Sequence, residues 1–212
     1  MLRTDLLLYA YASGMFPMAE DKDSNTIRWM SPQRRGIMPL NRFRISRSLR
    51  RTLTKHNYGI KIDYDFAGTI AGCADRDTTW INDDIRKAYL QLHKEGYAHS
   101  LEVWNNSQLV GGVYGVTLGA AFFGESMFSR QRDSSKVALA FLISQLRQTG
   151  FVLFDVQYLT SHLASLGAIE INQEEYKTLL KNAIRKRVNF LSAPIAQPHE
   201  VIQRSTQTSN RG

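Results

Sequence analysis

Apolar residues recur at helical spacing in several stretches of the chain, most clearly over residues 134–148. There Leu139, Leu142 and Leu146 fall on one face, and Gly150 follows. This pattern is typical of a helix that buries one side and stops at a glycine. The same spacing, with residues suited to capping helix starts, predicts further helices over 2–11, after Ser46, over 66–73, between Asn82 and Gly96, over 161–166 and after Asn172.

Between residues 99 and 128 the pattern changes to the alternation and glycine punctuation typical of strands. It predicts an antiparallel meander of three strands over 100–104, 109–118 and 120–128. Outside this meander, strands are predicted over 37–40, 58–63, 151–157 and 168–171. A meander combined with crossing helices predicts an α/β or α+β fold with a mixed sheet.

Changes in composition divide the chain into three parts. Residues 1–38 form a small N-terminal domain, residues 39–191 form the main domain, and the Pro-, Gln- and Ser-rich residues 192–212 are expected to be a flexible tail. The start of the chain resembles a signal peptide, but Asp5 interrupts its short apolar run, which favours a helix. No segment approaches the roughly 18 apolar residues needed to span a bilayer. A cytoplasmic location is therefore expected.

The 212-residue chain carries a formal net charge of +8. Much of this excess lies between residues 24 and 62, where ten cations occur without an acidic residue, and a second basic group lies over 177–187. Solvated surface charge is one explanation, but unneutralised like charges cost stability, and phosphate groups would neutralise them. A nucleic acid or a phosphorylated ligand is therefore expected as a partner. The single cysteine excludes an intramolecular disulfide and a multi-cysteine zinc site.

The strand over 151–157 places a carboxylate and an amide in an apolar setting. With a period of two, Asp155 and Gln157 share a face with Phe151 and Leu153. Burying a carboxylate costs free energy unless it is paired or hydrogen-bonded. Either Asp155 is a structural group bonded to the following turn, or it belongs to a site at the end of this strand, where α/β folds often place their clefts.

A second polar group lies in the segment 124–130. Glu125 and Arg130 stand there among apolar neighbours, and the two can also simply pair with each other. A serine nucleophile is not indicated, because no Gly-x-Ser-x-Gly turn is present. No phosphate-binding glycine loop occurs either, so neither a metal nor a nucleotide cofactor is indicated. The remaining reactive side chains are predicted to be structural: His99, His162 and Cys73.

Several blocks of sequence, in this order, resemble one known family. They are Ser13-Gly14-Met15-Phe16-Pro17, Trp29-Met30-Ser31-Pro32, Ser46-Arg47-Ser48-Leu49, Thr79-Trp80-Ile81, His99-Ser100-Leu101-Glu102-Val103-Trp104, residues 109–116, residues 124–130, Ser135-Lys136, Asp155-Val156-Gln157 and residues 162–168. Over roughly residues 5–180 the chain resembles the leucyl/phenylalanyl-tRNA–protein transferases.

This resemblance implies a bacterial cytoplasmic enzyme that works as a monomer and without a cofactor. Its activity would move leucine or phenylalanine, with methionine also tolerated, from aminoacyl-tRNA to proteins that begin with Arg or Lys. Such proteins are thereby marked for degradation by the N-end rule. The main domain would have an N-acetyltransferase-like fold, preceded by the small N-terminal domain, and the basic surface would contact tRNA.

The resemblance also implies site residues. At the reaction centre, Asp155 would orient or polarise, Gln157 would contact the attacking amine, and Glu125 would hold a cationic amine. The substrate-binding positions would be Trp80, Met127, Leu142, Leu146, Phe154 and Thr160, with core packing as the alternative for the two leucines. The tRNA-contacting residues would be Arg34, Arg35, Arg44, Arg47, Arg50 and Arg51.

The sequence departs from the family pattern at a few positions. Met18 stands where a tryptophan often follows Phe-Pro, Val156 replaces a cysteine, and Gln173 replaces an arginine. These changes bear on adenosine stacking and acceptor preference. Two other functions are compatible with the same features: a coenzyme A-dependent N-acetyltransferase, for which the pyrophosphate loop is missing, and a non-catalytic tRNA-binding protein.

Overall fold

A seven-stranded mixed sheet forms the centre of the molecule. The computed structural model describes residues 2–24, 26–55 and 58–206. The strands follow the order β4 (Gly59–Ile62), β5 (Ala98–Asn105), β6 (Gln108–Leu118), β7 (Ala121–Ser129), β8 (Leu153–Gln157), β3 (Arg34–Ile37) and β9 (Ile169–Asn172). The fold is therefore mixed α+β, and the predicted antiparallel meander is confirmed as β5, β6 and β7.

One pair of neighbouring strands, β7 and β8, is parallel. The helix α5 (Ser134–Gln148) connects them, with the bounds that the apolar spacing predicts. Pairing joins Ala121–Phe123 to Leu153–Asp155 and goes no further, although β7 continues to Ser129. The two strands therefore part near the middle of the sheet.

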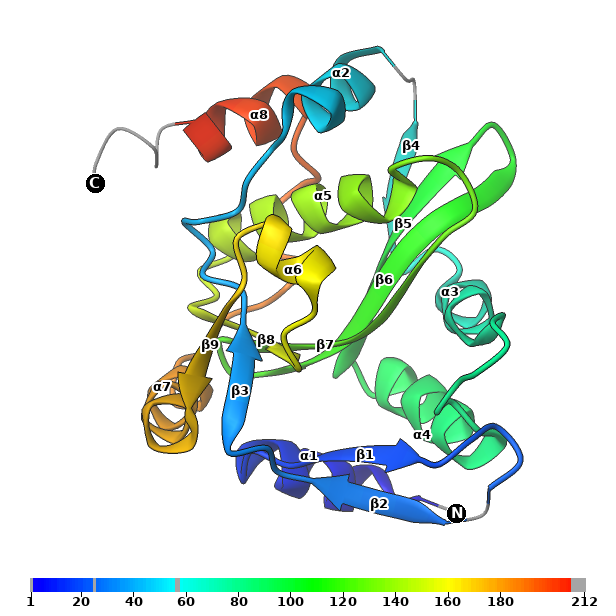
Figure 1. Ribbon diagram of the computed structural model, residues 1–212, viewed down its shortest axis with the longest axis vertical. Helices are drawn as coiled ribbons and strands as arrows, with labels where there is room; N and C mark the ends of the chain where they lie inside the picture. Colours follow the sequence, from blue (N-terminus) through cyan, green and yellow to red (C-terminus); the bar gives the residue numbers. More distant parts are fainter. Residues whose placement is uncertain (1, 25, 56–57, 207–212) are drawn as a thin grey trace.

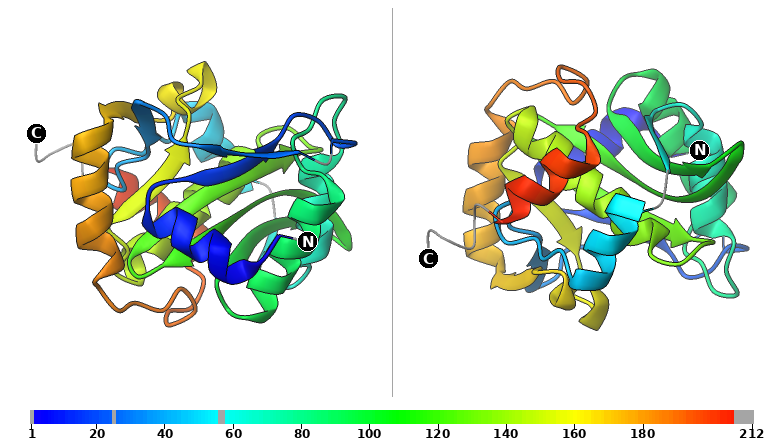
Figure 2. Two further views of the ribbon diagram at one scale, coloured as in Figure 1. Left: turned by 90° about the horizontal axis from the view of Figure 1, so that it is seen from below. Right: turned by 90° about the horizontal axis from the view of Figure 1, so that it is seen from above.

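Helices cover both faces of the sheet (Figure 1). One face carries α5, α2 (Arg47–Lys55) and α8 (Pro198–Thr206), and the other carries α1 (Thr4–Ala12), α3 (Phe66–Ala74), α4 (Asp83–Lys94) and α7 (Gln173–Ile184). Figure 2 shows α8 and α5 over the sheet from one side and α1 and α4 from the other. Each layer encloses its own apolar core, and the short α6 (Ser161–Ser165) follows β8.

The predicted helix starts rest on capping side chains. The side chain of Asn82 accepts a hydrogen bond from the backbone N–H of Ile85, and that of Asn172 accepts one from Glu175. Ser46 Oγ accepts from the N–H of Leu49 at 3.1 Å. These bonds satisfy N–H groups that have no partner within the helix.

The first part of the chain forms a small unit beside the sheet. Helix α1 packs next to a separate two-stranded sheet of β1 (Phe16–Ala19) and β2 (Ile27–Met30). Residues 34–37 were assigned from the sequence to this small domain, but they form β3 within the large sheet. The strand predicted over 37–40 lies at 34–37, so its predicted position is wrong by three residues. Arg35 and Gly36 are not typical strand residues, and their partners come from distant parts of the chain.

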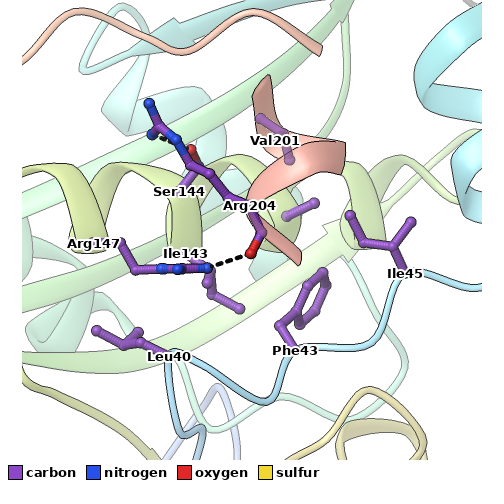
Figure 3. A pocket seen from close by; sticks show the side chains of 9 residues that line it. Leu40, Phe43, Ile45, Ile143, Ser144, Arg147, Val201 and Arg204 are labelled. Atoms are coloured by element: carbon purple, nitrogen blue, oxygen red, sulfur yellow. Dashed lines mark hydrogen bonds between the residues drawn. The ribbon is translucent and has the colours of Figure 1, made fainter. Parts of the chain in front are cut away.

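The C-terminal segment corrects the prediction of a flexible tail. Residues 198–206 form α8, and Val201 and Ile202 are buried in the core beneath it. Arg147 donates a hydrogen bond to the backbone O of Arg204 at 2.9 Å, and Arg204 donates to Ser144 Oγ at 3.0 Å (Figure 3). Only a cavity of about 10 Å3 remains between α8 and α5. The rest of the predicted tail, residues 207–212, lies outside the described residues.

Within the part of the chain that the structure describes, the helices are too short or too polar to cross a membrane.

Candidate active site

A cleft of about 270 Å3 opens where β7 and β8 part. Apolar side chains form much of its wall, and a carboxylate, a guanidinium and an indole also line it. The lining residues are Arg76, Trp80, Val113, Gly124, Glu125, Ser126, Met127, Leu139, Phe154, Val156, Thr160 and Leu163. A largely apolar cleft with a few polar groups is the usual form of a small-ligand site.

Glu125 enters this cleft from a β-bulge. Gly124 pairs with Gly115 and Ser126 pairs with Tyr114, so Glu125 is an extra residue on β7. Bulges often redirect a side chain next to a functional site. The carboxylate accepts hydrogen bonds from the hydroxyl of Tyr11 at 2.7 Å, that of Tyr89 at 2.9 Å and the side-chain amide of Gln157 at 3.2 Å.

The environment of Glu125 shifts its ionisation to near neutral pH. Burial raises the pKa of this carboxyl to about 7, although the hydrogen bonds from Tyr11, Tyr89 and Gln157 oppose the shift, and the nearby charge of Asp155 adds to it. Burial also raises the pKa of Tyr11 and Tyr89 well above the ordinary value, so both phenols remain donors. A carboxyl with a pKa near 7 is suited to accept or donate a proton under physiological conditions.

Asp155 is enclosed by protein groups. Its carboxylate accepts from Arg35 Nε at 2.9 Å and Nη2 at 2.7 Å, and from the hydroxyl of Tyr176 at 2.6 Å. The same guanidinium donates to the backbone O of Gly14 at 3.1 Å. Asp155 is fully buried, and its neighbour Val156 lines the cleft from the opposite face of the strand. Asp155 therefore supports the site from behind.

Gln157 connects this buried pair to Glu125. Its backbone N–H donates to Asp155 Oδ1 at 2.8 Å, and its side chain reaches Glu125. Its φ of 64° is unusual for a residue other than glycine, and such conformations persist where neighbours hold them. Gly36 permits the close approach, since a Cβ there would lie 2.9 Å from the backbone N of Leu159.

Most of the predicted substrate-binding residues lie together. Trp80, Met127, Phe154 and Thr160 line the cleft with Glu125. The other two, Leu142 and Leu146, are not among the lining residues and pack in the core, in keeping with the alternative weighed for them. Leu139, one turn earlier on α5, takes part in the wall instead.

The predicted basic residues have different surroundings. Arg44, Arg47, Arg50 and Arg51 are exposed, and Arg34 is exposed but pairs with Glu170 at 2.9 Å. Arg35 was predicted to contact tRNA, and its burial corrects that prediction: only 1% of it is exposed, and Asp155 neutralises it. In the sequence, Arg35 stands among arginines that are exposed, and its partner Asp155 lies 120 residues further along the chain.

Sequence reasoning missed three tyrosines and one arginine of this region. Tyr89 was expected only as part of an apolar helix stripe, and neither Tyr11 nor Tyr176 was singled out. A buried tyrosine hydroxyl usually requires a partner, and that is the one signal the sequence offers for them. Arg76 follows α3 and reaches the cleft.

Two alternatives about reactive side chains are settled by their contacts. Arg130 pairs with Asp75 at 3.3 Å, so it is not the partner of Glu125. Cys73 is fully buried, and burial raises the pKa of its thiol to about 12, which confirms its structural role.

The fold and the site together define an α+β protein with a ligand cleft where two parallel strands separate. The carboxyl group of Glu125, whose pKa is raised, lines this cleft. Family comparisons identify the protein further. Residues 37–181 match the family model described as leucyl/phenylalanyl-tRNA protein transferase, and residues 1–33 match the model of that protein's N-terminal domain. The chain belongs to this family.

Two proteins of similar sequence agree with this assignment. A leucyl/phenylalanyl-tRNA–protein transferase of Roseobacter denitrificans is 58% identical, and the match covers 98% of this chain and 99% of that protein. One from Ruegeria pomeroyi is 56% identical over the same shares. Among solved structures, a crystal structure of FemX matches with 13% identity and a TM-score of 0.48, covering 84% of this chain and 71% of the other.

Proposed function

We propose that this chain transfers an aminoacyl group from aminoacyl-tRNA to the N-terminus of an acceptor protein. The observation that carries the proposal is Glu125, a carboxyl with a pKa of about 7 at the wall of an apolar cleft. Membership of the transferase family supplies the class of substrates. In finer detail, we propose leucine, phenylalanine or methionine as the acyl group and an N-terminal Arg or Lys on the acceptor.

The reaction is aminolysis of an ester. The acceptor's α-amino nitrogen forms a bond to the ester carbonyl carbon, and the bond between that carbon and the ribose oxygen breaks. The proton lost by the amine ends on the departing ribose hydroxyl. Because the α-amino group has a pKa near 8, it needs only modest help to lose its proton. Bringing the two substrates together supplies much of the rate.

Glu125 is the group suited to manage the proton. When ionised, it attracts the acceptor's ammonium group into the cleft and accepts the proton that this group must lose before the amine attacks. The second proton leaves the nitrogen after the new bond forms and is the one that ends on the ribose oxygen. Its pKa of about 7 leaves a large ionised fraction at neutral pH. The two tyrosines hold the carboxylate in one orientation, since each donates to a different oxygen atom.

Gln157 and Asp155 have separate roles in this proposal. Gln157 lies beside Glu125 and contacts the attacking amine or the ester. Asp155 touches no substrate, because it is fully buried among protein groups. It is a positioning residue that fixes the backbone of Gln157.

The cleft wall favours an apolar acyl side chain. Met127, Leu139 and Phe154 form its apolar part. An apolar pocket discriminates by only roughly 1–3 kcal/mol per methylene group. Flexible Met127 adapts to side chains of different shape, which supports acceptance of leucine, phenylalanine and methionine alike.

The remaining parts of the proposal concern the whole molecule. Arg44, Arg47, Arg50 and Arg51 form an exposed group around α2 that we assign to tRNA binding. We propose a cytoplasmic location, where aminoacyl-tRNA is present, and action as a monomer. We also propose an N-acetyltransferase-like main domain, which the mixed sheet with its single parallel pair supports.

A peptide assay tests the proposed function. The protein is incubated with radiolabelled leucyl-tRNA and a peptide that begins with Arg, and a peptide that begins with Glu is the control. Label is expected on the first peptide alone, and acetyl-coenzyme A should not modify either. Binding of tRNA without any label on the peptide would instead identify a tRNA-binding protein that is not a transferase.

A further inference from the structure

Arg76 is a cation fixed at the wall of the cleft. Its Nε donates to the backbone O of Cys73 at 2.8 Å, and its Nη2 donates to Ser126 Oγ at 2.9 Å and to the backbone O of Met127 at 3.2 Å. The side chain remains exposed. Three bonds to two different elements thus hold the guanidinium in one orientation beside Glu125's strand.

Among residues 2–24, 26–55 and 58–206, Arg76 forms no salt bridge. Its three hydrogen-bond acceptors are all neutral oxygens. Of the neighbouring acids, Asp75 pairs with Arg130, and Glu125 accepts from two tyrosines and Gln157. Asp77, the next residue along the chain, is exposed and forms no salt bridge with Arg76 within the described residues. Within the same residues, Nη1 of Arg76 makes no hydrogen bond. An oriented guanidinium with one free nitrogen is suited to bind an anion.

The groups of the cleft can be compared with those at the end of an aminoacyl-tRNA. The acyl side chain fits the apolar wall, and Glu125 is left to the attacking amine of the acceptor. The terminal base fits an aromatic platform such as Trp80, which is partly exposed in the cleft. One charged group of the aminoacyl-tRNA end then remains, the phosphodiester on the 5′ side of the terminal nucleoside, and one charged group of the cleft remains, Arg76.

We propose that Arg76 binds the phosphodiester that precedes the terminal nucleoside of the aminoacyl-tRNA. This inference rests on the proposed function and adds a specificity-determining residue to it. Arginine binds phosphate oxygens through charge-assisted hydrogen bonds, which are stronger than bonds between neutral groups. The contact fixes the nucleoside, and thereby the ester, relative to Glu125.

Two minimal substrates test this contact in the intact protein. Phenylalanyl-adenosine lacks the phosphate, and phenylalanyl-adenosine 5′-phosphate carries it; an Arg-starting peptide is the acceptor for both. The unaltered protein is expected to use the phosphorylated substrate with a kcat/KM about tenfold to a hundredfold higher, as a charged hydrogen bond provides. Arg76→Gln should abolish this preference, so that the ratio of the two kcat/KM values falls to about one.

Further variants separate charge from structure. Arg76→Lys keeps the charge without the planar fork, so part of the preference should remain. The matched control is Arg86→Gln on α4, where an exposed arginine pairs with Asp83; this variant should keep the full preference. Because the two substrates are compared within each variant, a general loss of activity in Arg76→Gln does not change the ratio that is measured.

Different outcomes would contradict the inference about Arg76 for different reasons. If Arg76→Gln lowers both rates equally, Arg76 only supports the cleft and the inference is wrong. If Arg76→Gln instead weakens binding of the acceptor peptide, the guanidinium serves the acceptor and the inference is likewise wrong. If the unaltered protein transfers from tRNA but ignores the phosphate, the inference fails and the proposed function stands. Absence of any transfer, even from charged tRNA, would contradict both the inference and the proposed function.

Discussion

Glu125 illustrates how a single bulge changes the chemistry of a strand. Without the extra residue, the alternation along β7 would not deliver this carboxylate to two phenols that come from the N-terminal helix and from α4. Its burial raises the pKa, and its hydrogen bonds limit the rise. The residue is thus kept close to the point at which it exchanges a proton.

The ionisation of Glu125 predicts how stability depends on pH. Its pKa rises from 4.5 to about 7 on folding, so the folded protein binds this proton more tightly than the unfolded chain does. The resulting stabilisation is complete below pH 4.5 and is lost as the pH rises through about 7. Relative to Glu125→Gln, the unfolding free energy should therefore fall by roughly 3 kcal/mol across that range.

Urea unfolding of both proteins between pH 5 and 8 measures this difference. The Gln variant is the natural reference, because it keeps the shape of the side chain and removes its titration. Parallel pH profiles for the two proteins would show that Glu125 ionises normally. In the transfer assay, the rate of the unaltered protein should rise with pH through about 7, because the ionised carboxyl is the form that accepts a proton.

Asp155 gives a second prediction at this scale. Asp155→Asn leaves the buried Arg35 without a counter-charge, so we expect a loss of about 3–5 kcal/mol in stability. Release of the Gln157 backbone should also lower kcat about tenfold or more, while binding of tRNA changes little. Tyr176→Phe, which removes one hydrogen bond of the same carboxylate, is the matched control and should cost less, about 1.5–3 kcal/mol.

The comparison of kcat with KM separates positioning from general destabilisation. At a temperature where both variants are folded, a positioning role predicts a lower kcat with an unchanged KM for tRNA. If Asp155→Asn turns over at the rate of the unaltered protein whenever it is folded, Asp155 has no part in the reaction.

At the scale of single elements, the spacing of apolar residues predicts those helices and strands whose formation depends mainly on neighbouring residues. Residues 134–148 are helical as expected, because their apolar stripe and the following glycine suffice to define the helix. The position of strand β3 was predicted wrongly, because the sequence does not show the partners of Arg35 and Gly36. The buried Arg35 requires the counter-charge of Asp155, and Gly36 is required where the backbone of Leu159 comes close. Such partners come from distant parts of the chain, and periodicity does not contain them.

The same reasoning explains the error at the C-terminus. Composition suggested a tail without structure, but a short helix is stabilised mainly by what it packs against. Here α8 covers α5 and the segment around Phe43 (Figure 3). Burial of Val201 and Ile202 supplies the stabilisation that the polar composition conceals.

This packing is testable by two substitutions on one helix. Val201→Ala should lower the unfolding free energy by roughly 2 kcal/mol, because it removes apolar area from the core. His199→Ala, at an exposed position of α8, should have an effect near zero. Denaturant unfolding measures both, and equal effects would mean that α8 does not pack as described.

At the scale of the whole molecule, charge and fold act together. The sequence predicted six arginines as tRNA contacts. Four of them lie exposed on α2 and in the segment before it, and their contact with tRNA stays a prediction. The sequence did not predict which would be neutralised, because Glu170 and Asp155 reach Arg34 and Arg35 only through the sheet.

The basic group around α2 leads to a prediction about salt. The double variant Arg47→Ala with Arg50→Ala should weaken tRNA binding and flatten the dependence of log K on log salt concentration by about one to two, as expected for the loss of two phosphate contacts. The double variant Arg86→Ala with Lys87→Ala provides a control with the same loss of two charges on α4. A salt dependence identical to that of the unaltered protein would show that Arg47 and Arg50 are ordinary solvated surface residues that do not contact phosphate.

The guanidinium of Arg35 bonds the turn at Gly14 on one side and Asp155 on the other, and Tyr176 completes the set. These groups are distributed over most of the polypeptide. The segment up to Tyr176 must therefore leave the ribosome before the arrangement behind Gln157 can assemble. Products truncated before that residue would consequently carry the basic surface without a working centre.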